Sequence, residues 1–391
     1  MHPIKTGGHQ VIPSGPPRGQ PSSWTVAPAS GPLPEALGEQ RRLVVVEVPP
    51  LDDGEAGEAL PVGGVFERGV LEGAELLISA DRGQDLRRAG GGLGGGGLVE
   101  QSLFRLPEAR PASRESLSVG LTQARTVFQE AQYAKLSRTL PGLISGSLAS
   151  NAHDIAARAY VLLAQLAIKN YQGMAWVAAE RARAQAELTG NPVVMGEAAH
   201  SMGVTMRRGG DYQAAIAHLQ EAAARLGGRP EELAMRGTLM LTASYSAAQS
   251  GWRSQAMDLI GDAEETAKRR ETAAQRLYIP GVFGEDQTRV FRISVHHALG
   301  EDDQALTYAE KIDPRRLPNA ERRGRMCMDV ARVWQGIGEP ANAFHALRAL
   351  ASYAPEEATR PKVRAIASEL LVMNPDMPGL RRFSQKIGVT V

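Results

Sequence analysis

The sequence has 391 residues, of which 43% are hydrophobic and 22% are charged, and this is the balance of a soluble folded protein. Its 44 basic and 43 acidic side chains give a net charge of +1. This balance gives no reason to expect nucleic acid, an acidic membrane or a polyanionic substrate as a partner. A single cysteine excludes an internal disulfide framework and a cysteine-rich zinc site.

Residues 1–112 differ in composition from the rest of the chain. They hold most of the proline, a glycine run over 90–97 and little helical periodicity. Such a segment buries too little apolar surface to offset its chain entropy, so we predict that it is mostly disordered. The exceptions are a strand over 43–48 and a weak helix over 70–86. No apolar core follows the first residues, which predicts no secretory signal and a cytoplasmic location.

The glycine run contains a GxGxxG spacing at Gly90, Gly92 and Gly95. A dinucleotide site with this fingerprint needs a strand before it and a helix after it. We find neither pattern in the flanking residues, and we therefore favour a flexible linker. A Gly-Lys-Ser/Thr phosphate loop is absent from the sequence.

Helical periodicity begins near Ser113 and continues to the end of the chain. We expect Pro141 to kink or shorten its helix, and the sequence Thr-Gly-Asn-Pro at 189–192 to end one helix and start the next. The predicted helical hairpins are 115–130 with 133–144, 152–169 with 172–188, the two halves of 197–226, 231–249 with a return through 268, 289–299 with 304–311, and 320–335 with 342–353. A closing helix over 356–373 and a short one over 379–387 follow.

The hairpin over 197–226 has the clearest pattern. Small and apolar residues lie on one face of each half, and Gly210 and Asp211 between the halves suit a left-handed helix end followed by a helix N-cap. The small residue Gly203, the Gly-Asp-Tyr turn and the small residues Ala215 and Ala222 match the tetratricopeptide (TPR) pattern. Ala199 stands where that pattern has its tryptophan.

The turns of the predicted hairpins recur about every 40 residues, against about 34 in a strict TPR. They fall at 131, 170, 210, 251, 300 and 338. A hairpin of this kind cannot cover its own apolar face, so its neighbours must bury it. We therefore predict an all-α, TPR-like right-handed superhelical solenoid of about six hairpins with a capping helix over 113–391.

The sequence offers no constellation of residues for catalysis. No histidine pair has the zinc-protease spacing, and the adjacent His296 and His297 point about 100° apart on a helix. A Gly-x-Ser-x-Gly nucleophile turn is also absent. Cys327 lies in a helical stretch and is best explained as a small buried hydrophobe. We predict that the protein is not an enzyme and holds no cofactor or metal.

Binding is the better hypothesis, because the first helix of each TPR hairpin lines a concave groove. Arginines beside a tyrosine and polar groups suit a peptide, a carboxylate or an amphipathic helix. For Arg207 and Arg208 the alternative is that they are solvated charges at a helix end. The predicted groove residues are His200, Val204, Arg207, Arg208, Leu241, Tyr245 and Gln249, continued by Tyr160, Arg292, His296 and Arg332.

Two basic clusters lie outside this set, at Lys268-Arg269-Arg270 and at Arg322-Arg323 with Arg325. Acidic residues dilute both of them, and aromatic residues make up only 5% of the chain. We therefore favour solvated helix faces over a DNA footprint.

Residues 113–391 resemble the C-terminal TPR part of actinobacterial transcriptional regulators whose N-terminus carries a helix-turn-helix of the Cro/CI (XRE) type. The likeness rests on the small-residue run WVAAERA from Trp176, the TGNP stop at 189–192, the GDYQAAIAHLQEAA hairpin from Gly210 and the ending LRRFSQKIGV from Leu380. The resemblance implies transcriptional regulation, with DNA as a partner and possible dimerisation.

No helix-turn-helix is recognisable in residues 1–112. Three explanations stay open. The chain is a divergent member of the group that has lost DNA binding, or it works through a partner. Alternatively, the first hundred residues are a mistranslated reading frame that precedes the true fold. Two functions stay open at this point. One is a TPR regulator that binds a peptide, protein segment or small effector, and the other is a TPR scaffold or adaptor that binds a protein partner and no DNA.

Overall fold

The computed structural model describes residues 95–170, 173–269 and 283–389, and within these ranges it is all-helical, without a strand. The predicted disordered segment up to residue 94, the strand over 43–48 and the helix over 70–86 lie outside the described residues. The helices are α1 (Gly95–Phe104), α2 (Arg114–Gln129), α3 (Tyr133–Ala149), α4 (His153–Lys169), α5 (Ala175–Glu187), α6 (Pro192–Arg208), α7 (Tyr212–Ala224), α8 (Pro230–Gln249), α9 (Arg253–Arg269), α10 (Glu285–Ala298), α11 (Asp302–Ala309), the 3-10 turn η2 (Pro314–Arg316), α12 (Ala320–Ile337), α13 (Pro340–Tyr353), α14 (Pro355–Ala358), α15 (Pro361–Met373) and α16 (Leu380–Lys386).

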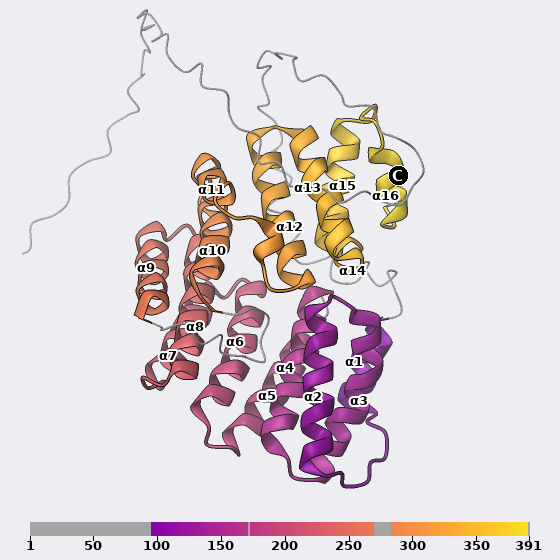
Figure 1. The fold of residues 1–391 in the computed structure, drawn as a ribbon, viewed down its shortest axis with the longest axis vertical. Helices are drawn as coiled ribbons and strands as arrows, with labels where there is room; N and C mark the ends of the chain where they lie inside the picture. Colours follow the sequence, from indigo (N-terminus) through magenta and orange to yellow (C-terminus); the bar gives the residue numbers. More distant parts are fainter. Residues whose placement is uncertain (1–94, 171–172, 270–282, 390–391) are drawn as a thin grey trace, which may run out of the picture. The chain divides into compact units, whose positions relative to one another are not determined.

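Consecutive helices pack as pairs, and the pairs pack on one another (Figure 1). The pairs are α2 with α3, α4 with α5, α6 with α7, α8 with α9, α10 with α11 and α12 with α13. In addition, the first helix of each pair contacts the first helix of the next, from α2 through α12. Helix α12 also contacts α2, so segments about 200 residues apart in the sequence lie against each other.

Buried apolar side chains form two clusters. One is formed mainly by α1 to α9 and also includes Val295 of α10 and Ala320 of α12, and the other is formed by residues from α10 to α16. Cys327 lies fully buried in the second cluster, and burial raises the pKa of its thiol to about 12. The prediction of a small buried hydrophobe at this position is confirmed.

The turns follow the predicted chemistry. Gly210 has a φ of +86°, and the Asp211 side chain accepts a hydrogen bond from the Ala214 amide at 3.1 Å. Asn191 caps α6 in the same way, with Pro192 as the first helical residue. The first turn has no glycine, and Ala131 takes the left-handed conformation there with a φ of +55°.

Two predicted helix boundaries near prolines are wrong. Helix α3 continues past Pro141 to Ala149, because the fully buried Leu140 and Ile144 keep this part of the helix packed on the core. The closing helix predicted over 356–373 is instead two helices, α14 and α15. Pro361 forces the preceding Arg360 into an extended conformation, with φ −66° and ψ 148°, and this divides them.

A helix also begins within the glycine run, where none was predicted. Helix α1 begins at Gly95, and its Val99 and Leu103 are 1% and 2% exposed. It contacts α3 and α4. Burial of these two side chains against neighbouring helices stabilises a helix that its glycine-rich sequence does not favour.

Candidate functional site

A pocket of about 80 Å³ lies among five helices, and we call it the basic pocket. Its walls come from α4, α6, α8, α10 and α12, which are the first helices of five consecutive pairs, and from Arg360 between α14 and α15. The lining residues are Gln165, Ile168, Lys169, His200, Val204, Arg207, Arg208, Thr242, Tyr245, Val290, Phe291, Ser294, Glu321, Arg322, Arg325, Asp329 and Arg360. Six of these side chains are basic and two are carboxylates.

Helix α6 places its predicted residues in the pocket because they share one face. His200, Val204 and Arg207 are four and three residues apart, so they follow one another along the helix. On the other side Gly203 packs against Leu219 of α7, where an added Cβ would lie 2.6 Å from the leucine Cγ. Close packing of α6 on α7 therefore leaves the histidine and arginine face toward the pocket.

Arg207 is the residue whose charge is least compensated. Its guanidinium lies over the Tyr245 ring, 4.8 Å from the ring centroid. Among the described residues no carboxylate pairs with it. Burial, together with the charges of Arg208 and Arg325, lowers the pKa of Arg207 to about 10. A guanidinium without a carboxylate partner is a favourable binding partner for an anion.

A second group of charges surrounds Asp329 of α12. Asp329 accepts hydrogen bonds from Arg325 at 3.0 Å and from Ser294 at 2.7 Å, and Arg332 lies 3.7 Å away. One carboxylate therefore faces two guanidinium groups. Although burial alone raises the pKa of Asp329, the two arginines outweigh it and lower that pKa.

The positive potential extends to Tyr245 and Lys362. Arg332 donates to the Tyr245 hydroxyl at 3.5 Å. Burial alone would raise the pKa of Tyr245, but Arg332, Lys362 and Arg325 lower it to about 8. Burial and then Arg332 lower the pKa of Lys362, also to about 8. Both shifts report an excess of positive charge on this side of the pocket.

His200 is a neutral group of the pocket at physiological pH. It is 9% exposed, and burial followed by the charges of Arg207 and Arg322 lowers its pKa to about 3. Gln165 lies 3.4 Å from its Nδ1 and donates to Ser201 at 3.2 Å. The imidazole therefore offers a hydrogen bond without adding charge.

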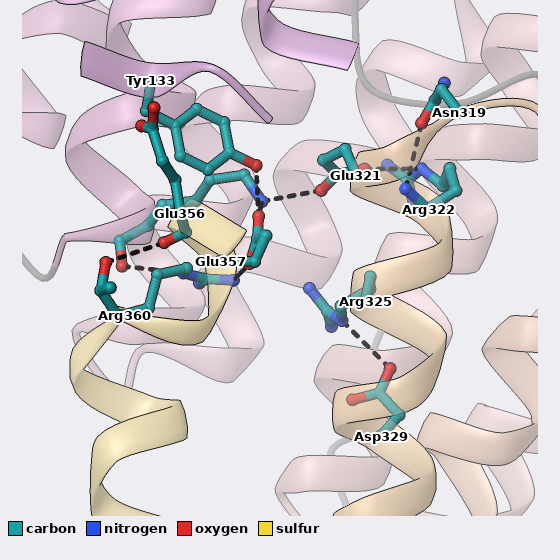
Figure 2. Close-up of polar contacts among 11 residues, drawn as sticks. Tyr133, Asn319, Glu321, Arg322, Arg325, Asp329, Glu356, Glu357 and Arg360 are labelled. Carbon is teal, nitrogen blue, oxygen red and sulfur yellow. Dashed lines mark hydrogen bonds and ion pairs between the residues drawn. The ribbon is translucent and has the colours of Figure 1, made fainter. Parts of the chain in front are cut away.

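Beside the pocket, a network of buried charges joins α3 and α4 to α12 and α14 (Figure 2). Lys169 donates to Glu321 at 2.7 Å and also to Glu357. Tyr133 and Arg360 donate to the same Glu357, and Arg360 donates to the Lys169 carbonyl at 3.2 Å. Burial alone raises the pKa of Glu357, but Arg360 and Lys169 hold it below its ordinary value. We call this the Lys169 network.

The two groups of charges differ in what they leave unpaired. In the Lys169 network each buried carboxylate has a cationic partner within hydrogen-bonding distance, since Arg322 also lies 3.0 Å from Glu321. That network holds distant segments together. Around Tyr245 the positive charges of Arg207, Arg325 and Arg332 meet one carboxylate. This part of the pocket has the capacity to bind an anion.

The other predicted groove residues lie elsewhere. Leu241 is 0% exposed and belongs to the core, as does Tyr160 at 2%, and Gln249 is exposed at the end of α8. Arg292 pairs with both oxygens of Glu264 on α9, at 2.8 and 2.9 Å. His296 pairs with Glu301 at 2.7 Å and stacks on Tyr308. Arg332 does not line the pocket itself, but it donates to the hydroxyl of Tyr245, which does.

The sequence reasoning missed most of the residues from α12. Arg322 and Arg325 were interpreted as part of a solvated face, and this is wrong, because both line the pocket and their side chains are 11% and 28% exposed. Their spacing with Asp329 and Arg332 was the available signal, since these residues follow one face of a helix. Of the other predicted basic cluster, Lys268 is exposed, and the Arg269 side chain and Arg270 lie outside the described residues.

The chain matches no protein-family model, and a search of curated proteins finds no match for it. Within the described ranges, none of the helices combines the length and the apolar character needed to cross a bilayer.

Proposed function

We propose that this protein is a cytoplasmic TPR-like regulatory protein whose basic pocket binds an acidic group of a peptide or protein partner. The observation that carries the proposal is Arg207, a partly buried guanidinium that no described carboxylate neutralises. Arg–carboxylate hydrogen bonds are strong and often bidentate, so an incoming carboxylate is its natural complement.

The arrangement of the helices supports the TPR part of the proposal. The pocket is lined by the first helix of five consecutive pairs, and these first helices also contact one another in series. In a TPR-like solenoid such helices form the concave, ligand-binding side.

The size of the pocket supports a ligand that enters only in part. Sites for whole small molecules usually measure about 300–1,000 Å³, and this pocket measures about 80 Å³. It therefore accommodates one carboxylate, from an acidic side chain or a chain terminus, while the rest of the partner stays outside. An uncharged ligand would leave Arg207 without a partner.

Fluorescence anisotropy with two labelled peptides tests the proposal. We expect a six-residue glutamate peptide to bind the full chain and a six-residue glutamine peptide not to bind. Substitution of Arg207→Gln should weaken glutamate-peptide binding about 10- to 100-fold, the effect of a lost charge-assisted hydrogen bond. Arg348→Gln is the matched control, because Arg348 is exposed on α13 and its loss changes net charge equally. If both variants weaken glutamate-peptide binding equally, the basic pocket is not the binding site.

A role in transcription is the second part of the proposal, and DNA binding distinguishes it from an adaptor role. A mobility-shift assay of the full chain at low salt, with and without the glutamate peptide, is the direct test. A sequence-specific shift supports a regulator, and gel filtration then shows whether a homodimer binds. If no DNA shifts under either condition, the protein is an adaptor that binds its partner through the same pocket.

A further inference from the structure

A second cavity lies among α5, α6 and α7, and we call it the α5–α7 cavity. Its volume is about 240 Å³, three times that of the basic pocket. Its walls are mainly apolar and include Met195, Ala199 and Met202 of α6 and Ala222 of α7. On α6 these residues occupy a different face from His200 and Arg207, and the linings of the two sites share no residue.

The cavity exists because short side chains face it. Ala199 lines it at the place where the TPR pattern has tryptophan, so an indole ring is missing from this wall. Helices α6 and α7 cannot close the space by approaching, since Gly203 already packs against Leu219 one turn further along α6. The missing ring therefore leaves space rather than a tighter helix contact.

The charges around the cavity neutralise one another. Arg183 pairs with Glu180 and Glu187 on α5, and Arg225 pairs with Glu221 on α7. In contrast to the basic pocket, no uncompensated charge favours an anion or a cation here. The ligand expected from these walls is apolar and carries no net charge.

A histidine in the wall of the cavity has a ring nitrogen without a partner among the described residues. His218 lines the cavity, and its Nε2 is buried without a hydrogen bond to any described residue. Burial, the main cause, lowers the pKa of His218, so the ring is neutral at pH 7. A neutral imidazole nitrogen donates or accepts one hydrogen bond. Because Nε2 is buried in the wall, a ligand with the complementary group satisfies it when the ring turns toward the cavity.

We propose that the α5–α7 cavity binds a small, uncharged aromatic molecule of one or two fused rings with one hydrogen-bonding group directed at His218 Nε2. An apolar cavity of about 150 Å³ suffices for benzene, and drug-sized ligands need about 300 Å³ or more. At about 240 Å³ the cavity lies between these limits and suits a two-ring molecule. This inference does not rest on the function proposed for the basic pocket.

Isothermal titration of the full chain with three probes tests the proposal. Indole supplies a donor, quinoline supplies an acceptor, and 1-methylindole has a similar shape with neither an N–H donor nor a ring-nitrogen acceptor. We expect indole or quinoline, according to the tautomer of His218, to bind about 10-fold more tightly than 1-methylindole. In His218→Phe that preference should disappear, and in His218→Gln it should persist in part. An equal preference in His218→Phe would overturn the role of Nε2.

A second test fills the cavity with a larger side chain. Ala199→Trp restores the ring of the TPR pattern and should abolish binding of every probe, whereas Ala217→Trp, on the exposed face of α7, should leave it unchanged. Circular dichroism checks that each variant folds, and Ala222→Phe fills the cavity from α7 if Ala199→Trp does not fold. The proposal fails if no probe binds the native protein at millimolar concentration, or if a folded cavity-filling variant binds like the native protein.

Discussion

Removal of Lys169 should destabilise the fold strongly, because this side chain compensates two buried carboxylates. Lys169 is 6% exposed at its side chain, Glu321 4% and Glu357 1%, and the ammonium contacts both acids. Breaking a buried ion pair costs about 3–5 kcal/mol. We expect the lower end of this range for Lys169→Met, since Glu321 keeps Arg322 and Glu357 keeps Arg360.

The measurement is thermal unfolding followed by circular dichroism at pH 7. A loss of about 3 kcal/mol corresponds to a fall in Tm of about 6 °C for a fold of this size. Lys135→Met is the matched control, because Lys135 is exposed on α3, and surface substitutions change stability by about 0.5 kcal/mol or less. If Lys169→Met lowers Tm no more than Lys135→Met, the network does not hold α4 to α12 and α14.

The pH dependence gives an independent check. Glu357 has a lowered pKa in the native fold, so its contribution is present above its unfolded pKa and is lost as pH falls through the folded value. Without Lys169, the pKa values of Glu321 and Glu357 rise, and the folded variant takes up protons earlier than the native protein. The difference in Tm between the variant and the native protein should therefore shrink between pH 7 and pH 4.

Two further predictions concern single residues. Ala131→Gly should stabilise the protein by less than about 1 kcal/mol. Glycine avoids the steric cost of about 1–2 kcal/mol that alanine carries at a φ of +55°, but it also removes a methyl group that is only 2% exposed, whose burial contributes about 0.8 kcal/mol. Urea unfolding measures this, and a destabilised variant would contradict it. His200 has a folded pKa of about 3, below its unfolded value, so the unfolded chain binds an extra proton below about pH 6.5 and stability falls with acid by up to about 1.4 kcal/mol per pH unit. His200→Gln should make the unfolding free energy less steep between pH 6.5 and 4, and an unchanged slope would show that His200 is protonated in the fold.

Sequence alone predicted the features that depend on neighbouring residues. The helices from residue 113 onward, the cap at Asp211 and the left-handed turn at Gly210 follow from local periodicity and turn chemistry. The clustering of His200, Val204 and Arg207 was also predictable, because one helix carries all three. Local rules failed at Gly95 and Pro141, where burial against other helices overrides helix propensity.

Tertiary structure decided which charges meet. Lys169 and Glu357 are 188 residues apart, and no helical spacing relates them. The same holds for Arg207 over Tyr245 and for Arg332 at its hydroxyl, which come from α6, α8 and α12. Whether an arginine is solvated or buried depends on the helix that packs over it, and so Arg325 was assigned to the surface from sequence but lines the pocket in the fold. The sequence by itself determined the helices and their faces, and only their packing determined that one arginine would be left without an acid.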